Sequence, residues 1–439
     1  MGHLVLVYCL NGVSTAAGQD QSVACRAAVA LALTTAKPKS QVPTITRGDS
    51  APREKFMKPT FKLCAVAKDE GPYLAEWVFH HLHFGFDAIH VYINRTSDAS
   101  AAVLERIRGT YPQVSYEFID WVDLCDPGVG AKLQTIAYAK ELDRSRQEGV
   151  GWLLFLDVDE FWVPNDFATP VDRFVAAITG DGQPQPICHL WHCELGQRAP
   201  FTPLQRGAGY ELSSHLKTLF PLDGIDIRHV RVHHPIFGAQ VTPLDADGAP
   251  MIFDEQQSEL AAQSVMKPKS AYIIHRMYRS EAEYLSLSLR GRPSQRSLLK
   301  MNRPGYRSHR NVTVHRRFFW PEEEFRAYDR DRERFLSELD IETLIAADKL
   351  AILERAERAT VLIKEKLDTP ERDKAVAFLR GTRHEVVVVP HEDKAASEPS
   401  PASVTRRDHS VPGREAPRTR SWLSILAGWF GLSRRHRMP

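Results

Sequence analysis

The residues best suited to chemistry are three carboxylates, Asp157, Asp159 and Glu160, in the stretch WLLFLDVDEFWVP at residues 152–164. They follow an uninterrupted apolar run, and carboxylates at the end of a buried strand are costly unless a partner holds them. Carboxylate oxygens suit Mg²⁺ or Mn²⁺, which bind few protein groups and leave positions open for phosphate oxygens. A purely structural role, such as capping a turn or pairing with an arginine, explains this short motif equally well.

The elements that would position these carboxylates alternate between strands and helices. Short apolar runs predict strands, and apolar residues at helical spacing predict helices. In chain order these are strands at 61–67, 87–93, 114–120 and 152–158, separated by helices at 72–84, 99–108 and 132–146. Apolar strands joined through helices indicate an α/β fold with a mainly parallel sheet covered on both faces.

Polar clusters follow three of the predicted strands, at 68–70, 94–98 and 157–160. In parallel sheets ligands bind beyond the carboxyl ends of the strands, so we expect these clusters to meet at one edge. If the fourth strand stays extended through residue 158, alternation places Asp157 and Asp159 on the same face. Together these features predict a site for a metal ion and a nucleotide diphosphate.

Beyond Pro164 the pattern is less regular. Further strands are predicted at 187–196, 226–234 and 270–278, a helix at 280–291, and charged amphipathic helices at 321–339 and 341–380. The sequence CHLWHC at 188–193 offers zinc-ligand types, but on one strand they would need a tight loop to converge. The histidines at 80, 81 and 83 are expected to be a feature of one helix rather than a second metal site.

The two ends of the chain differ in composition from its body. The 439 residues, 43% of them hydrophobic, suffice for one large or two medium domains with tails. We predict a leader at 1–56, disordered or preceding a true start at Met57, then a catalytic domain at 57–320. A helical extension at 321–384 and a disordered basic tail at 385–439 follow.

The basic tail contains one apolar stretch, SWLSILAGWFGL, at residues 421–432. It is too short to span a bilayer and has arginine-rich flanks, which fits an anionic membrane surface. Docking on a partner, or packing as a short helix on the body of the protein, are the alternatives. We do not expect nucleic acid as a partner, because no folded motif accompanies the arginines. Six scattered cysteines suggest a reducing, cytoplasmic location, at the inner membrane face if the tail binds there.

Taken together, the motifs over about 61–293 resemble the family 2-like and family 92-like glycosyltransferases of the GT-A fold. LCAVAKDEGPYLAEWVFHHLHFGFDAIHVYINRTSD follows the family pattern K-N-E-x-x-Y-L-x-E-W-x-x-x-H-x-x-x-G and then N-x-S-x-D, with Asp69 in place of the usual Asn. WLLFLDVDEFWVP carries D-x-D-E-F. IIHRMYRSEAEYLSLSLRGRP at 273–293 resembles a later motif, in which Ile274, Arg276 and Ser288 depart from the usual residues.

The resemblance implies a GT-A sheet, mixed but mainly parallel, flanked by helices and followed by C-terminal helices. It also implies a metal-dependent, hexosyltransferase-like enzyme of polysaccharide biosynthesis that uses Mn²⁺ or Mg²⁺. A sugar would pass with inversion from a nucleotide-sugar donor to a glycan, glycolipid or similar acceptor. The expected donor-binding residues are Glu70, Asn94, Asp98, Asp157, Lys217 and Arg279. The expected metal ligands are Asp159 and His275, with Asp157 as a further candidate.

Inversion also requires a general base near the acceptor hydroxyl. The acceptor-side region offers four carboxylates, and no motif chooses among them: Glu194, Glu211, Asp223 and Asp226.

Two other functions use the same carboxylates. A nucleotidyl or phosphosugar transferase should carry a glycine-rich nucleotide loop near the first strand, and KDEGPY has a single glycine. A non-catalytic carbohydrate-binding protein with a degenerate site is the other alternative. The substitutions at Ile274 and Arg276 leave room for it, whereas the intact Asp157/Asp159 pair favours an enzyme.

Overall fold

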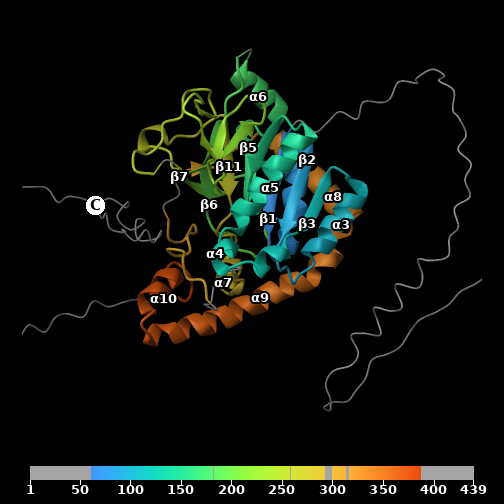
Figure 1. The fold of residues 1–439 in the computed structure, drawn as a ribbon. Coiled ribbons are helices and arrows are strands. Elements are labelled where there is room, and N and C mark those ends of the chain that lie inside the picture. Colours follow the sequence, from blue (N-terminus) through green and yellow to red (C-terminus); the bar gives the residue numbers. More distant parts are fainter. Residues whose placement is uncertain (1–60, 181, 258, 292–298, 313–315, 387–439) are drawn as a thin grey trace, which may run out of the picture.

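The computed structural model describes residues 61–180, 182–257, 259–291, 299–312 and 316–386 (Figure 1). The predicted leader at 1–56 and the apolar tail segment at 421–432 lie outside the described residues, so both stay predictions. The division at residue 320 into a catalytic domain and a helical extension is likewise untested.

One mixed sheet organises the described chain, with the strand order β3-β2-β1-β4-β7-β6-β11-β5. The first four strands are all parallel, and β11 is also parallel to β6, whereas β7 and β5 pair in antiparallel register. The strands are β1 (Phe61–Ala67), β2 (Ala88–Ile93), β3 (Val114–Phe118), β4 (Trp152–Phe155), β5 (Glu160–Pro164), β6 (Ile187–Glu194), β7 (Gly209–Pro221) and β11 (Ala271–His275). The short strand β10 (Leu244–Asp245) pairs with β6, and the short strand β12 (Arg316–Arg317) pairs with β7. β8 (Ile227–His229) and β9 (Ile236–Phe237) form a separate two-stranded sheet.

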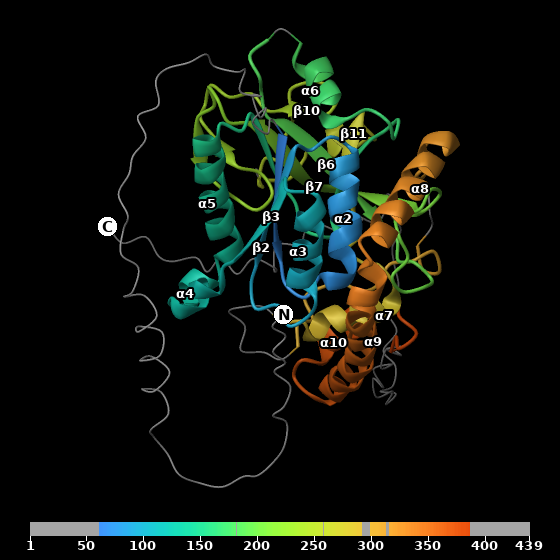
Figure 2. The ribbon, with the colours of Figure 1, turned by 90° about the vertical axis from the view of Figure 1, so that its right-hand side faces the viewer.

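Helices cover both faces of this sheet (Figure 2). One face packs against α2 (Gly71–His83), α3 (Ser100–Thr110) and α8 (Glu322–Glu338), and the other against α5 (Leu133–Glu148). Successive strand residues enter opposite cores: Leu154 packs on the first face and Phe155 on the second. This is why the strands read as continuous apolar runs. The predicted α/β class, a mixed sheet flanked by helices with further helices at its C-terminal side, is confirmed.

The long helix α9 (Ile341–Glu365) runs beneath the sheet and contacts α2, α3 and α7 (Glu281–Ser286). It does not continue to residue 380 as predicted. A 3₁₀ turn, η4 (Lys366–Asp368), follows it, and α10 (Arg372–Leu379) is a separate helix. Pro370 explains the break, because a residue that precedes proline disfavours the helical conformation. The remaining short elements are α4 (Pro127–Gly130), α6 (Val171–Thr179), η1 (Asp120–Leu124), η2 (Gln263–Val265) and η3 (Leu287–Leu289).

The fourth predicted strand, at 152–158, is wrong at its end. β4 stops at Phe155, and a turn closed by a hydrogen bond from Glu160 N to Asp157 O (2.9 Å) follows. The chain then crosses to the far edge of the sheet, where β5 pairs with β11. Asp157 and Asp159 therefore do not lie on one face of an extended strand. They occupy the turn between two strands that are not neighbours in the sheet.

No helix within the described ranges has both the length and the apolar character needed to cross a membrane.

Candidate active site

A cavity of about 590 Å³ opens at the carboxyl ends of β1, β2 and β4. The three predicted polar clusters meet there, because parallel strands end at the same edge. Its walls include Lys68 and Glu70 after β1, Asn94 after β2, and Asp157 and Asp159 after β4. His275, at the end of β11, also lines it. The cavity is the candidate active site.

Asp159 and His275 form a close pair in this cavity. The His275 Nε2 atom lies 3.6 Å from Asp159 Oδ2, and Arg276 N donates a hydrogen bond to Asp159 O (2.8 Å). Burial alone would lower the pKa of His275, but the Asp159 carboxylate outweighs burial and raises it above its ordinary value. Burial would raise the pKa of Asp159, yet the imidazolium charge holds it well below its usual range. The carboxylate is thus ionised and has a cation as its partner.

Behind this pair, Lys217 on β7 binds two of the carboxylates. Its Nζ lies 3.1 Å from Glu160 Oε2 and 3.9 Å from Asp157 Oδ2, and neither Lys217 nor Glu160 is exposed. Burial raises the pKa of Glu160 to about 7, although the lysine charge opposes this. Lys217 was predicted to bind the donor, but it is not among the residues that line the cavity. It fixes the turn that carries the two aspartates.

The fit of these residues to a divalent cation rests on Asp159 and His275. Asp157 is engaged elsewhere, because its Oδ1 accepts a hydrogen bond from Gln134 Nε2 (2.6 Å) and its Oδ2 faces Lys217. Across the described ranges, no group of three or more histidine, cysteine or acidic side chains is arranged to hold a metal ion. Mg²⁺ and Mn²⁺ can be held by one or two protein groups with phosphate oxygens and water. The pair therefore fits a two-ligand site only when His275 releases its proton, because a neutral imidazole is the metal-binding form.

Glu70 meets the cavity as part of an ion-pair cluster. It accepts hydrogen bonds from Arg279 Nη2 (3.1 Å) and from Arg290. Arg279 adopts the left-handed backbone conformation (φ 48°) directly before α7. A capping box between Ser280 and Glu283 fixes this turn. Arg279 does not line the 590 Å³ cavity, so it contacts the predicted donor residue Glu70 rather than the cavity itself.

The predicted donor residues at the end of β2 have different positions. Asn94 lines the cavity, and its side-chain amide donates to Asp123 Oδ2 (3.0 Å). Asp98 is not part of the cavity wall. Its carboxylate accepts from Gly71 N (2.7 Å) and from Ser100 N (2.9 Å), which ties the start of α2 to the start of α3. The structure thus gives Asp98 a positioning role.

Four basic side chains around the cavity were not predicted as site residues: Lys68, Arg290, Lys300 and Arg303. Two of them, Lys300 and Arg303, come from the irregular chain that follows α7, where no periodic pattern marks a position. Arg290 is part of the Arg-Gly pair in the later motif at 273–293, and this match is the only sequence feature that singles it out. These cations give the cavity wall a basic character, which suits an anionic ligand.

None of the four base candidates lines the cavity. Glu194 is buried, and its Oε2 accepts from Arg276 Nε (2.7 Å). Glu211 is paired with Arg307. Asp226 is paired with Arg228, and Asp223 is exposed in the chain that follows β7. The structure does not bring these carboxylates together, and the base stays unassigned.

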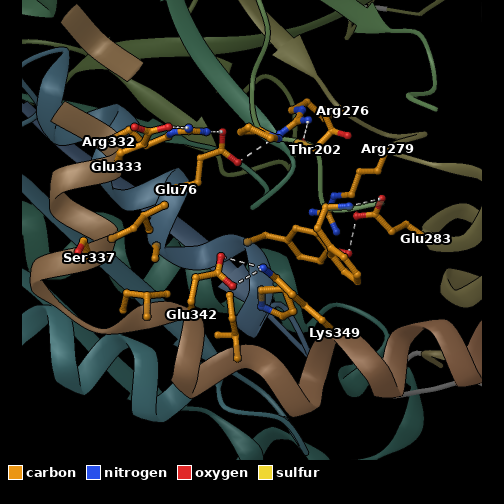
Figure 3. A pocket seen from close by; sticks show the side chains of 18 of the residues that line it. Glu76, Thr202, Arg276, Arg279, Glu283, Arg332, Glu333, Ser337, Glu342 and Lys349 are labelled. Atoms are coloured by element: carbon orange, nitrogen blue, oxygen red, sulfur yellow. Dashed lines mark hydrogen bonds and ion pairs between the residues drawn. The ribbon is translucent and has the colours of Figure 1, made fainter. Parts of the chain in front are cut away.

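A second cavity, of about 450 Å³, lies on the other side of Arg279 between α2, α8 and α9 (Figure 3). Arg276 reaches into it and donates to Thr202 O (2.6 Å), with Glu76 Oε2 at 3.4 Å. Arg332 of α8 approaches the same glutamate at 3.8 Å. The network holds Arg276, next to His275 in the chain, against the helices. This network therefore supports the candidate active site by fixing the residue next to His275.

The predicted alternatives for metal binding are placed elsewhere. Cys188 and Cys193 lie on β6, and Cys188 approaches Thr218 and His234, but the described residues form no group of three metal-ligand side chains there. His80 and His81 are buried in α2, where their ring nitrogens bond to the backbone oxygens of Trp162 and Trp77. Both histidines are thus accounted for by packing and local hydrogen bonds.

The comparison with known families addresses the resemblance directly. Residues 66–194 match the family model described as Glycosyltransferase family 92. A curated family 92 protein from Ricinus communis is 29% identical over 101 residues, which is 23% of this chain and 16% of that relative. The matched segment runs from the end of β1 through β6 and includes all three polar clusters. The predicted resemblance to family 92 glycosyltransferases is therefore confirmed over this part of the chain.

Solved glycosyltransferases also overlap with the chain. A mannosyltransferase from Pyrobaculum calidifontis, in complex with GDP-Man and Mn²⁺, matches at a TM-score of 0.28 and 12% identity, covering 74% of this chain and 80% of that chain. A galactosyltransferase, LgtC, in complex with donor and acceptor sugar analogues, matches at a TM-score of 0.21 and 16% identity, covering 37% and 58%. These TM-scores describe limited overlaps, and the fold class rests on the sheet topology itself.

Proposed function

We propose that this chain is a glycosyltransferase that takes a sugar from a nucleotide-sugar donor bound in the 590 Å³ cavity. The proposal rests on the side chains that line this cavity. The Asp159–His275 pair stands there with four basic side chains at the carboxyl edge of parallel strands, inside and beside the segment that matches family 92. Ligands of open α/β sheets bind at this edge.

In this proposal Asp159 and His275 hold Mn²⁺ or Mg²⁺. The bound cation would stabilise the negative charge that develops on the leaving nucleotide diphosphate. Arg290 and Arg303 would bind the same diphosphate through charge-assisted hydrogen bonds. Asn94 and Glu70 would face the nucleoside. Lys217 and Asp98 would act by positioning, since both bind the turns that carry the contacting residues.

The acceptor and the stereochemistry belong to the proposal as well. We propose a glycan or glycolipid acceptor and inversion at the transferred sugar, on the basis of the family resemblance. A cytoplasmic location is also proposed, and the four free cysteines within the described chain accord with a reducing compartment. Contact of residues 421–432 with an anionic membrane remains a prediction from the sequence.

Calorimetry of the full chain with UDP-, GDP- and CDP-sugars, with and without Mn²⁺, tests this function. We expect one nucleotide class to bind, and Mn²⁺ to tighten the binding. Asp159→Ala should remove the effect of Mn²⁺. The matched control is Asp172→Ala, because Asp172 is an exposed carboxylate on α6 outside the cavity.

Three results would count against the proposal. Equal tightening by Mn²⁺ in the wild type and in Asp159→Ala would refute the metal role. Failure of every nucleotide sugar to bind would refute the donor site. Donor binding with neither sugar transfer nor slow donor hydrolysis would favour the non-catalytic carbohydrate-binding alternative.

A further inference from the structure

An exposed apolar surface lies beside the candidate active site. Within the described residues, eight large hydrophobic side chains are exposed, and four of these belong to residues 118–129. Leu124 is 90% exposed, and Phe118 and Trp121 are each 47% exposed, with Val129 as the fourth. Several exposed apolar side chains within one short segment point to a surface that binds a partner. We call it the 118–129 surface.

The local fold shows why these side chains are not part of the core. After β3 ends, the chain continues as η1 and then α4, which contact each other (Figure 2). Ile119 and Val122 are buried beneath, so the segment already has its own core anchors. Phe118 contacts the ring of Tyr116, and Lys140 lies over the ring of Trp121, but the larger part of the Leu124 side chain has no such cover.

Acidic side chains are interleaved with the apolar ones. Asp120, Asp123 and Asp126 lie in the same twelve-residue stretch, which contains no basic residue. Arg95 offsets part of this charge through its ion pair with Asp123 (2.5 Å). A partner for this surface should therefore present apolar side chains flanked by positive charge.

We propose that the 118–129 surface binds residues 421–432 of the same chain. That segment, SWLSILAGWFGL, has large apolar residues at 422, 425, 426 and 429, a spacing that fits one face of a short amphipathic helix. Arginines precede it at 418 and 420 and follow it at 434, 435 and 437. The segment thus has the two properties that the surface requires, an apolar centre and basic ends.

The chain between the described fold and residues 421–432 is long enough for that segment to reach the 118–129 surface. The described part ends at Val386, which leaves 36 residues to Trp422. A flexible chain of that length spans about 35 Å on average, and about 120 Å when fully extended. The folded part, at its size, has a radius of gyration of about 20 Å. The tail can therefore reach the surface from any point where it leaves the fold, and tethering raises its effective concentration to about the millimolar range.

The acidic character of the surface distinguishes this partner from a membrane. An anionic bilayer would repel Asp120, Asp123 and Asp126, whereas it would attract the same arginine-rich tail. The position of the surface also gives docking a consequence. The chain that follows it directly, at Gly130, Ala131, Leu133 and Gln134, lines the 590 Å³ cavity. The inference itself does not depend on what that cavity binds.

Hydrogen–deuterium exchange of the full chain, followed by mass spectrometry, tests the docking from both sides. Leu124→Asp should speed exchange in peptides covering 421–432 by about tenfold or more, which corresponds to a loss of about 1.4 kcal/mol of docking free energy. Trp429→Ala should likewise speed exchange at 118–129. The matched control is Leu350→Asp, which changes an exposed leucine on α9 (63%) and should leave 421–432 unaffected.

Other occupants give different results, and each would overturn the proposal. Protection that grows with protein concentration would indicate a second copy of the chain. Protection of 421–432 that appears only with vesicles of phosphatidylserine and phosphatidylcholine would indicate a membrane. Unprotected exchange of 421–432 in the wild type would mean that nothing is docked. Unchanged exchange elsewhere in Leu124→Asp checks that the variant is folded.

Discussion

At the scale of single residues, the DVDE turn divides its carboxylates between two tasks. Asp159 faces the cavity with His275 as its partner, while Glu160 is buried against Lys217. Asp157 stands between them, held by Gln134 and facing the same lysine. A buried carboxylate needs a hydrogen-bonded cation, so the lysine lets the turn keep three acidic residues beside the 590 Å³ cavity.

Lys217→Met tests this division. The change leaves Glu160 buried without its cation, and we expect a loss of about 3–5 kcal/mol in the free energy of unfolding. Urea unfolding measures it. The control is Lys140→Met, whose half-exposed pair with Glu117 should contribute about 0–1 kcal/mol. Adding Glu160→Gln to Lys217→Met should restore part of the loss, and a double variant no more stable than Lys217→Met would contradict the pairing.

Arg303→Gln tests the unpredicted cations on the cavity wall. A charge-assisted hydrogen bond contributes about 1.5–3 kcal/mol, so donor affinity should fall about 10- to 100-fold. Calorimetry with the nucleotide sugar that binds the wild type measures this. Arg307→Gln is the matched control, because Arg307 binds Glu211 and does not line the cavity. Equal losses in both variants would point to a general effect on folding rather than to contact with the diphosphate.

At the scale of elements, most of the first half of the fold could be predicted, and in the second half β6, β11 and α8 were predicted but β7 was not. The strands at 61–67 and 87–93 and the three helices between the parallel strands differ from the structure by two residues or fewer at their ends. These elements are buried on one or both faces, so their apolar pattern is strong. β7 gave no such signal, because the first half of GYELSSHLKTLFP is only half-buried and largely polar.

Some residues of the candidate site could be predicted from the sequence, and others could not. Asn94 and Asp159 directly follow predicted strands, Glu70 lies three residues beyond one, and the topology brought all three together. Arg303 is set by an irregular loop that no local pattern describes. Lys217 was recognised as important, but its place in the core depends on β7, a strand that the sequence did not reveal.

The junction between β1 and α2 leads to a prediction at this scale. A Cβ atom on Gly71 would lie 2.6 Å from Asp348 Oδ2 and 3.0 Å from Asp98 Oδ2, the carboxylates that hold the starts of α2 and α3. Gly71→Ala should therefore lower the free energy of unfolding by about 1–3 kcal/mol through overpacking. It should also weaken donor binding, because Glu70 precedes the altered residue.

The control for that variant is another helical glycine. Gly109 lies near the end of α3, and a Cβ atom added there would meet no other atom within 4 Å. Gly109→Ala should therefore raise stability by about 0.5–1 kcal/mol. Thermal unfolding of the two variants measures both changes. Equal stability of Gly71→Ala and the wild type would show that the two carboxylates move aside easily.

At the scale of the whole molecule, the cavity joins parts of the chain that are distant in sequence. Its walls come from β1, β2, the junction of α4 and α5, the turn after β4, the end of β11 and the loop after α7. Helix α9 connects these parts from below, through contacts with α2, α3 and α7. A ligand that binds Asp159, His275 and Arg303 together therefore bridges segments that must separate on unfolding.

Ligand binding should consequently raise the thermal stability of the entire chain. A donor with Mn²⁺ at 100 times its dissociation constant stabilises the folded state by about 2.7 kcal/mol. For a protein of this size we expect the melting temperature to rise by about 5 °C. Differential scanning fluorimetry of the full chain measures it, with EDTA as the metal-free arm. Asp159→Asn should lower the melting temperature of the metal-free protein, because His275 loses its charged partner, so the effect of Mn²⁺ is measured against the variant's own metal-free value. It should lose the additional rise that Mn²⁺ gives. A rise of the same size in EDTA would mean that the donor bridges these segments without a metal ion, through the cations alone.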